Sequence, residues 1–450
     1  MATKIVTKNS STASAVPTAS DLVQGELAVN VADKRLFTEN NAGAIVELGT
    51  NPTSLTVSGS LSTPTAGTSN VRFGVNAGNS IASGGNYNTV VGDEAGTAIT
   101  TGDYTTALGY NAGAGVTTGT ANTLIGGVAG DALTSGSENV AVGVSALTTD
   151  TLGKKAVALG NGALGVQNFT SATDNYNVGV GYLAGGSVTT GTNNTLIGGL
   201  AGDAITTGDN NVALGYEALT ANTVGDRSTA LGNYALKSQN PSSNADMYNV
   251  AIGHNAGGDV TTGTNNTLIG GLAGDATTTG SSNVAVGSAA LGANTTASNN
   301  TAVGYSALLS NTTGDANTAI GSGTLYASTT ASDNTALGKD AGANVTTGGN
   351  NTLIGRSAGV SNTTGTESVA LGSNSLSANT EGTANTALGA YALRNDTLGS
   401  RSVAVGHQAL NAQNFTSATS AYNVAVGANA GVAVTTGVRN TSSVVLQAML

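Results

Sequence analysis

Several absences narrow the kinds of protein that this chain can be. It has no cysteine, which excludes a disulfide framework and a thiolate metal site. Charged residues make up only 9% of it and sum to −11, which argues against a groove for nucleic-acid phosphates. It has no run of about 18 apolar residues, and its N-terminus lacks the apolar core of a signal peptide. The sequence therefore predicts no nucleic-acid binding, no membrane insertion and no ordinary secretion.

Glycine, by contrast, is abundant, at 66 of 450 residues, and much of it belongs to a repeat. One copy reads NNTLIGGLAGDA at residues 193–204. The unit is Asn, Thr or Val, Ala or Leu, an aliphatic residue, Gly, two variable residues, Ala, and then Gly or Leu. It occurs 21 times, with central glycines from Gly74 to Gly427 that lie 17 residues apart except for one step of 18 and three of 21. A period this short predicts a solenoid, in which one small unit stacks on itself.

The fixed positions indicate that the solenoid is built of β-structure. In Asn211-Val212-Ala213-Leu214-Gly215, the side chains of Val212 and Leu214 point one way and that of Ala213 the other. Alanine stands three residues after the glycine in 19 copies, which predicts a second short strand in a tight place, followed by turn residues such as TTG. Asparagine stands four residues before the glycine in 16 copies, and stacking would align these amides in a hydrogen-bonded ladder. The expected fold is all-β, a parallel β-roll of 17-residue coils.

The repeats also define the domain organisation. The β-roll is expected over residues 70–431. Before it, residues 1–50 read as a small β module with an extended arm, and residues 51–69 as a connecting strand or linker. Residues 432–450 break the pattern, because Val444 stands where a glycine is due. This end needs a cap, which the same segment of partner chains, another protein or a further domain would supply.

Two parts of the chain resemble known families. GELAVNVADKRLF (residues 25–37), with the NNAGAIVELG turn and strand after it, is similar to the N-terminal segment of bacteriophage tail-fibre and related virion proteins. The LTVSGSLS stretch (residues 55–62) is similar to the linkers that follow that segment. The repeats, with NVAVG or NTALG followed by two residues and Ala, resemble the head repeats of trimeric autotransporter adhesins, although those heads favour somewhat shorter units.

Together the resemblances imply a phage tail fibre, located in the virion, whose repeats form a left-handed β-roll in a homotrimer. The N-terminal module would dock on another tail or virion protein, and the residues expected to make this attachment are Leu27, Val29, Leu36 and Phe37. The rod would project toward a host cell-surface receptor, either a glycan or a protein.

A trimer is also expected on physical grounds. One narrow coil with Ala and Gly on one face has little apolar volume of its own, so that packing three such faces together would supply the missing burial. At about 4.8 Å per coil, the stack would rise on the order of 100 Å, which makes an elongated rod.

The three 21-residue steps carry related insertions, at residues 168–177, 240–249 and 414–423. Aromatic side chains and methionine on a polar scaffold often mark binding, and here they are candidate contacts to a glycan or protein. The alternative is that the loops only cover an adjacent coil or the trimer seam. The candidate residues are Phe169, Tyr176, Met247, Tyr248, Phe415 and Tyr422.

Two other functions stay open. A bacterial trimeric adhesin would need an export signal and a membrane anchor of alternating apolar strands. An ice-binding solenoid is suggested by threonine pairs such as Thr189-Thr190, Thr206-Thr207 and Thr261-Thr262. It would require a flat, regularly spaced threonine array, whereas these pairs adjoin a turn glycine and are not expected in the copies with Leu after the Ala.

Catalysis is not expected. His254 and His407 both occupy one variable position after a repeat glycine, and no Ser/His/Asp arrangement stands out. Asp131, Asp203 and Asp275 recur as GDA, but they are 72 residues apart. Stacking would separate them by about 19 Å, too far for a carboxylate pair or a calcium site. The sequence therefore predicts no enzyme, no cofactor and no metal.

Overall fold

The chain divides into two compact units, Met1–Ser62 and Thr63–Leu450. The computed structural model describes residues 66–443 without a gap and, before them, residues 7–12, 15–18, 20–22, 24, 26–30, 32, 35–39 and 45–47. Most of the linker expected at residues 51–69 therefore lies outside the described residues. All regular structure in the described parts of the chain is β.

The N-terminal unit contains a four-stranded sheet in the order β1-β2-β3-β4. Its strands are β1 (Thr7–Ser10), β2 (Leu27–Asn30), β3 (Arg35–Glu39) and β4 (Ile45–Glu47). Strand β1 runs parallel to β2, and the other two pairs are antiparallel. Leu22, Ala28 and Phe37 form its buried core, with Ile45 packed against them.

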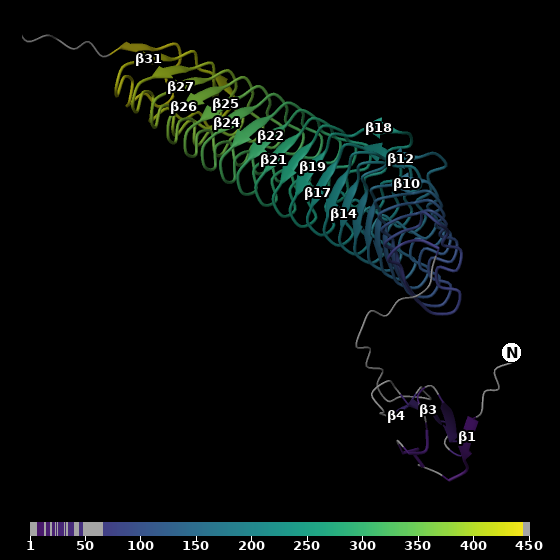
Figure 1. Ribbon diagram of the computed structural model, residues 1–450. Coiled ribbons are helices and arrows are strands. Elements are labelled where there is room, and N and C mark those ends of the chain that lie inside the picture. The colour runs from purple at the N-terminus through teal and green to yellow at the C-terminus, as the bar shows by residue number, and fades with distance from the viewer. Residues whose placement is uncertain are drawn as a thin grey trace, which may run out of the picture. The chain divides into compact units, whose positions relative to one another are not determined.

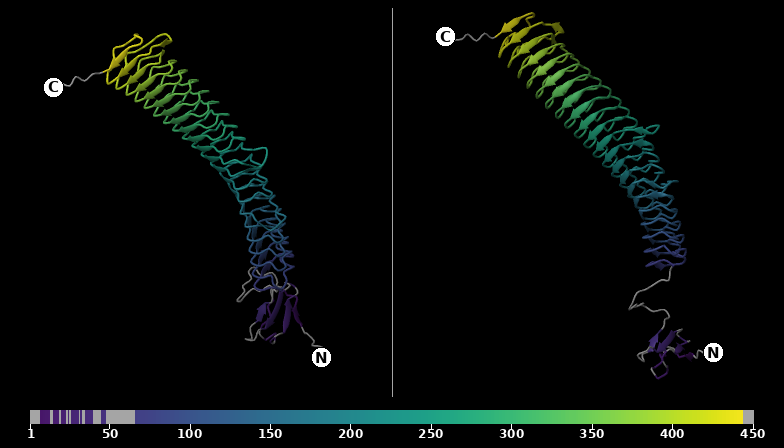
Figure 2. Two further views of the ribbon diagram at one scale, coloured as in Figure 1. Left: turned by 90° about the horizontal axis from the view of Figure 1, so that it is seen from above. Right: turned by 45° about the horizontal axis from the view of Figure 1, so that its top comes forward.

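The second unit is a long stack of coils, each of which contributes one three-residue strand to a continuous parallel sheet (Figure 1). Each strand pairs with the strands of the coils before and after it, as β14 does with β13 and β15. The stack curves gently along its length (Figure 2). This confirms the prediction of an all-β parallel solenoid with 17-residue coils. The 22 strands are β5 (Val71–Phe73), β6 (Thr89–Val91), β7 (Thr106–Leu108), β8 (Thr123–Ile125), β9 (Val140–Val142), β11 (Val157–Leu159), β13 (Val178–Val180), β14 (Thr195–Ile197), β15 (Val212–Leu214), β17 (Thr229–Leu231), β19 (Val250–Ile252), β20 (Thr267–Ile269), β21 (Val284–Val286), β22 (Thr301–Val303), β23 (Thr318–Ile320), β24 (Thr335–Leu337), β25 (Thr352–Ile354), β26 (Val369–Leu371), β27 (Thr386–Leu388), β29 (Val403–Val405), β31 (Val424–Val426) and β32 (Thr441–Ser443).

The repeat glycine follows each strand of the long sheet from β5 to β31 because other residues do not fit there. At Gly215, φ is +140°, a value that L side chains rarely adopt. A Cβ at this position would also lie 2.5 Å from the carbonyl carbon of Gly232, the equivalent glycine of the next coil. The glycines therefore allow both the turn and the close stacking of successive coils.

Two arrangements fill the interior of the coils. In one, Leu196 occupies the centre of the strand and Gly202 stands opposite, where a Cβ would lie 2.7 Å from Leu196 Cδ2. In the next coil, Ala213 occupies the centre of the strand and Leu219 takes the place equivalent to Gly202. Leu196, Ala213 and Leu219 are all fully buried. One leucine thus fills each of these two coils, from one side or the other.

Buried asparagines connect the coils as a ladder. Asn194 Oδ1 accepts a hydrogen bond from the backbone N–H of Asn211 at 3.0 Å, and Asn194 Nδ2 donates to the carbonyl of Gly208 at 2.8 Å. Asn211 repeats the second contact with Gly225 at 2.9 Å. Each amide thereby satisfies backbone groups of the following coil, which fixes the register of the stack.

The segment after each glycine is not the second strand that the sequence predicted. In the coil of Gly215, Glu217 and Leu219 both have left-handed φ values, 53° and 58°. A left-handed residue at every second position prevents an extended backbone. The segment still bonds to the next coil, since the N–H of Leu219 donates to the carbonyl of Ala235 at 3.0 Å.

The solenoid also continues beyond residue 431, where the repeat was expected to end. Strand β32 pairs in parallel with β31, so that the irregular end expected at 432–450 is regular as far as Ser443. Residues 444–450 lie outside the described chain. At the centres of the first and last strands stand the polar residues Arg72 and Ser442, where every strand between them has Ala, Leu, Val or Gly. Arg72 Nε donates to the carbonyl of Ala77 at 2.5 Å.

Candidate functional site

The outer face of the long sheet combines a row of threonine and valine with a row of apolar residues. In β15 the central Ala213 is fully buried, whereas Val212 and Leu214 on either side are 39% and 44% exposed. The same alternation recurs along the sheet, with the central residue turned into the coil and its two neighbours turned outward. This corrects the expectation that a face of Ala and Gly packs between chains. The alanines fill their own coil because its interior is too narrow for two larger side chains.

The outward residues form two parallel rows that we call the outward strip. The first row consists of threonine and valine three residues before each glycine, and the second of aliphatic residues, with one phenylalanine, directly before it. The rows are Val71, Thr89, Thr106, Thr123, Val140, Val157, Val178, Thr195, Val212, Thr229, Val250, Thr267, Val284, Thr301, Thr318, Thr335, Thr352, Val369, Thr386, Val403 and Val424, and Phe73, Val91, Leu108, Ile125, Val142, Leu159, Val180, Ile197, Leu214, Leu231, Ile252, Ile269, Val286, Val303, Ile320, Leu337, Ile354, Leu371, Leu388, Val405 and Val426.

The outward strip is large for a surface that faces water. At about 4.8 Å per coil and about 3.3 Å per residue along each strand, it measures on the order of 100 Å by 10 Å, or about 1,000 Å². The largest apolar patch on a typical monomeric protein covers only about 300–600 Å². Because threonine stands at eleven of the 21 positions of the first row, only part of the strip is apolar, but its second row is apolar without a break. A continuous apolar row of this length is typical of an interface.

The threonine pairs of the turns present only one free hydroxyl each. In the first threonine of a pair the hydroxyl donates to the carbonyl of the next coil, as from Thr189 to Thr206, from Thr206 to Thr223 and from Thr261 to Thr278, at 3.0–3.1 Å. These hydroxyls help to join the coils. Only the second threonine of each pair, such as Thr190, is exposed.

The structure separates the loop residues that the sequence grouped together. Tyr176, Tyr248 and Tyr422 are 51%, 48% and 45% exposed. Phe169 and Phe415 are only 5% exposed, and Met247 is fully buried. These last three side chains therefore fill the space beneath the loops and are not available for the surface contacts that we expected of them.

A basic residue lies beside each exposed tyrosine. Lys155 Nζ donates a hydrogen bond to Asp174 at 2.6 Å and lies 5.1 Å from the centroid of the Tyr176 ring, and this hydrogen bond to Asp174 raises the pKa of Lys155. Arg227 pairs in the same way with Asp246 and Tyr248. In the third loop, Arg401 donates to the Tyr422 hydroxyl at 2.6 Å. The loops are held by short parallel strand pairs, β10 (Gly153–Lys154) with β12 (Thr173–Asp174), β16 (Gly225–Asp226) with β18 (Ala245–Asp246), and β28 (Gly399–Ser400) with β30 (Thr419–Ser420).

A buried polar network under the first loop was not predicted from the sequence. Asp150 accepts hydrogen bonds from the N–H groups of Gly153 and Phe169, at 3.0 and 3.1 Å, and from Gln167 Nε2 at 2.7 Å. Gln167 in turn accepts from Asn177 Nδ2 at 2.8 Å. Burial raises the pKa of Asp150 despite these donors.

The other two loops show what determines this network. Under the third loop, Asp396 accepts from the N–H of Phe415 at 3.1 Å, as Asp150 does from Phe169. Under the second loop, the equivalent pair is Asn222 and Pro241, and proline has no N–H to donate. The spacing of 19 residues between the acid and Phe, or between Asn and Pro, is the sequence signal that could have revealed the network.

In the N-terminal unit, the four candidate attachment residues lie on two faces of one sheet. Phe37 is 1% exposed and belongs to the core, so it does not offer an attachment surface. Leu27 and Val29 alternate with the buried Ala28, and Val29 pairs with Leu36 across the antiparallel ladder. Leu27, Val29 and Leu36 therefore share the half-buried face opposite the core.

Neither histidine belongs to a cluster of titratable groups. The His254 ring packs edge-on against Tyr234 at 5.8 Å, and His407 packs in the same way against Tyr391. Within the described residues, no group of three or more His, Asp or Glu side chains is arranged to hold a metal ion. The same residues include no helix long and apolar enough to cross a bilayer.

No family model, curated protein or solved structure matches this chain. The outward strip and the loops are therefore the observations from which a function has to be argued.

Proposed function

We propose that this chain is a structural, non-enzymatic virion protein, a bacteriophage tail fibre, in which three copies pack their outward strips together into one rod. The observation that carries the proposal is the strip itself, since an unbroken row of apolar residues, beside a row of threonine and valine, faces outward along all the repeats. An apolar surface so regular fits best against a partner with the same coil spacing. A second and a third copy of the same chain have that spacing.

The size of the strip supports packing against other copies of the same chain. An interface of standard size buries about 800 Å² on each partner, and the strip offers about 1,000 Å². Because the strip is only two residues wide, a face-to-face pair would leave its edges open to water. Three strips around a common axis cover one another, which favours the trimer that the resemblance to adhesin heads implies.

The N-terminal unit would attach the rod to another tail or virion protein. Leu27, Val29 and Leu36 supply a half-buried apolar face for that contact, next to a core that is already complete without them. The far end or the exposed loop tyrosines would then meet the host surface. Several weak contacts on one particle would multiply through avidity.

The bacterial adhesin gains no support from a specific feature of the structure. An ice-binding solenoid would need an unbroken threonine array, whereas valine interrupts the outward threonines at ten of the 21 first-row positions. For ice binding, the threonine pairs would have to present both hydroxyls on a flat face, whereas the first hydroxyl of Thr189, Thr206 and Thr261 is engaged within the stack.

Deleting residues 1–50 tests the proposed attachment. We expect the shortened chain to form the same soluble trimeric rods and to be absent from assembled particles, as judged by immunogold labelling in electron micrographs. The full chain, produced in parallel, should be present on the particles. Rods that reach the particle without residues 1–50 would refute attachment through the N-terminal unit.

A further inference from the structure

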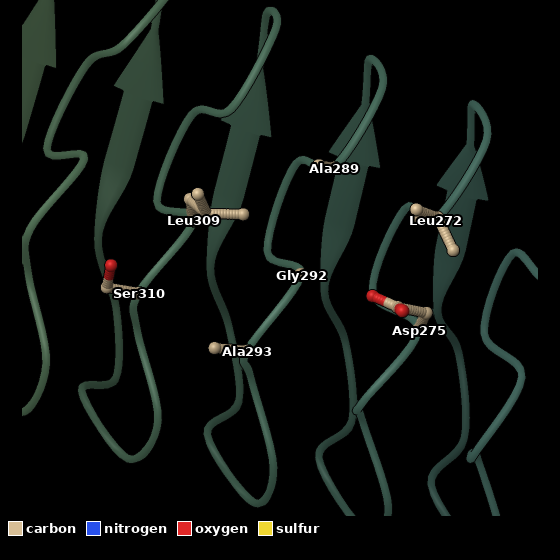
Figure 3. A pocket seen from close by; sticks show the side chains of 7 residues that line it. All are labelled: Leu272, Asp275, Ala289, Gly292, Ala293, Leu309 and Ser310. Atoms are coloured by element: carbon tan, nitrogen blue, oxygen red, sulfur yellow. The ribbon is translucent and has the colours of Figure 1, made fainter.

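A shallow hollow of about 390 Å³ opens on the turn segments of three successive coils, away from the outward strip (Figure 3). Leu272 and Asp275 come from the first coil, Gly292 from the second, and Leu309 and Ser310 from the third. Two small residues of the second coil, Ala289 and Ala293, complete its lining.

The hollow lies where glycine replaces a threonine that follows the equivalent aspartate in two other places. Asp275 is the third of three equivalent GDA aspartates, after Asp131 and Asp203. In the first two copies, the threonine 17 residues later donates its hydroxyl to the aspartate Oδ1 at 2.5 Å, from Thr148 to Asp131 and from Thr220 to Asp203. At Asp275 the equivalent residue is Gly292, which has no hydroxyl to donate and leaves the carboxylate uncovered.

The uncovered carboxylate is in an environment that favours a donor. Burial raises the pKa of Asp275, and the negative charge of Asp259 raises it further, while backbone N–H groups of the loop oppose the shift. Apolar walls strengthen a hydrogen bond made beside them because they displace competing water. Leu272, which is 43% exposed, and Leu309 provide such walls.

We propose that the hollow binds one ring of a neutral saccharide. A ring hydroxyl would donate to Asp275 as the hydroxyls of Thr148 and Thr220 donate to their aspartates. The C–H face of the ring would pack on Leu272 and Leu309, and a second hydroxyl would reach Ser310. Asp131 and Asp203, which accept hydrogen bonds from threonine hydroxyls, indicate that Asp275 can accept a hydrogen bond from an O–H group. A pyranose ring combines such O–H donors with an apolar face.

The inference deepens the proposed function and rests on it in one respect, which is that a host-surface glycan is the source of the saccharide. A shallow site with one charged acceptor binds weakly, with a Kd on the order of 1 mM. Three sites on each rod, and several rods on each particle, would convert this affinity into firm attachment.

Saturation-transfer difference NMR on the full chain tests the site, with the methyl glycosides of glucose, galactose, rhamnose and fucose as probes. We expect transfer to at least one glycoside, and loss of that transfer in Gly292→Thr. A Cβ at Gly292 would lie 3.0 Å from Leu309 Cδ1 and 3.5 Å from Asp275 Oδ1, so that the introduced threonine fills the hollow between the leucine wall and the carboxylate. Asp275→Asn should weaken binding at least tenfold.

Gly271→Thr is the matched control, because a Cβ there would meet nothing within 4 Å and the hollow stays open. It should bind like the wild type. Transfer that persists in Gly292→Thr, or no transfer to any probe, would overturn the inference. Light scattering on the same samples separates the two proposals: rods of three chains without glycoside binding refute only the saccharide site, and single chains that bind a glycoside refute only the fibre.

Discussion

The residue buried beneath each of the three long loops is Asp where the loop supplies a phenylalanine N–H to it, and Asn where the loop has proline instead. Asp150 and Asp396 each receive an N–H from a phenylalanine, whereas Asn222 faces Pro241, which has none. Asn222 instead donates its own Nδ2 to the carbonyl of Gly225 at 2.9 Å. A buried carboxylate is stable only where enough donors surround it, and the amide replaces it where one donor is lost.

Asn222→Asp should therefore destabilise the second loop by about 3 kcal/mol at neutral pH, because the buried charge would face the Gly225 carbonyl and would keep only the N–H of Gly225 as a donor. Hydrogen exchange of the loop amides measures the local loss. The control is Asn193→Asp, the same change at an exposed position. Equal protection in the two variants would contradict this explanation of the Asp and Asn choice.

Asp150 gives a prediction with a defined pH direction. Its folded pKa is raised above 3.8 by burial, so its stabilising contribution is fully present below that pH and is lost as pH rises through the folded pKa. Asp150→Asn does not titrate at this position. The melting temperature of the wild type minus that of the variant should thus fall between about pH 3 and about pH 7.

Asp174→Asn provides the opposite sign for comparison. The hydrogen bond from Lys155 lowers the pKa of Asp174, so that its contribution is present above the unfolded pKa and is lost as pH falls. The melting temperature of the wild type minus that of Asp174→Asn should change little with pH, because the Lys155–Asp174 pair is exposed. If the melting temperature of the wild type minus that of Asp150→Asn instead increased as pH rises, the pKa of Asp150 would be lowered, contrary to our description of the network.

In the coils of β14 and β15 a buried leucine enters either from the strand, as Leu196 does, or from the turn opposite, as Leu219 does. This predicts a compensating pair of substitutions in the coil of β14. Gly202→Leu alone should be destabilising, since the added atoms meet Leu196 and Ile205 within 2.8 Å. Leu196→Ala alone should leave a cavity and cost about 3 kcal/mol.

The double variant Leu196→Ala/Gly202→Leu moves the leucine to the side that Leu219 occupies in the next coil, while Ile205 stays where that coil has Asn222. It should recover about 2 kcal/mol relative to the sum of the single changes, as measured by thermal unfolding in a double-mutant cycle. The backbone tolerates leucine there, because Gly202 and Leu219 have φ values of 55° and 58°. Strict additivity would refute the idea that the two positions exchange volume.

The sequence was sufficient to predict some of these elements. The period, the β alternation and the asparagine ladder follow from residues at fixed positions, such as Asn194 and Gly198, whose role is local and repeated. The inward direction of Ala213 did not follow, because both sides of the strand are apolar and only the width of the coil decides between them. The second strand was wrongly predicted because Glu217 and Leu219 adopt left-handed φ values that their residue types do not signal.

The loop residues were predictable only in part. Phe169 and Tyr176 look equivalent as aromatic residues in one insertion, yet Phe169 is buried and Tyr176 is exposed beside Lys155. The difference lies in the tyrosine hydroxyl, which finds polar partners at the surface. The hollow at Asp275 depends on the comparison of three coils in space, and only the absence of a threonine at Gly292 hinted at it in the sequence.

At the scale of the whole solenoid, the buried core inside the coils and the outward strip are formed by different residues. Residues such as Val212 and Leu214 contribute little to the interior of their coil, so replacing them with charges should leave the coil folded. A variant with Leu214→Lys and Leu231→Lys is therefore expected to keep its β circular dichroism spectrum and to lose its partners. The matched control is Thr190→Lys/Thr207→Lys, at exposed positions outside the strip.

The most direct test of the proposed assembly is the mass of the full chain in solution, measured by light scattering coupled to size exclusion. The chain mass is 43.4 kDa, and we expect three times this value together with the hydrodynamic radius of an elongated particle. The double-lysine variant should elute at the mass of one chain, and the threonine control at three. A wild-type chain that remains monomeric at the concentrations used for the variants would contradict assembly through the outward strip.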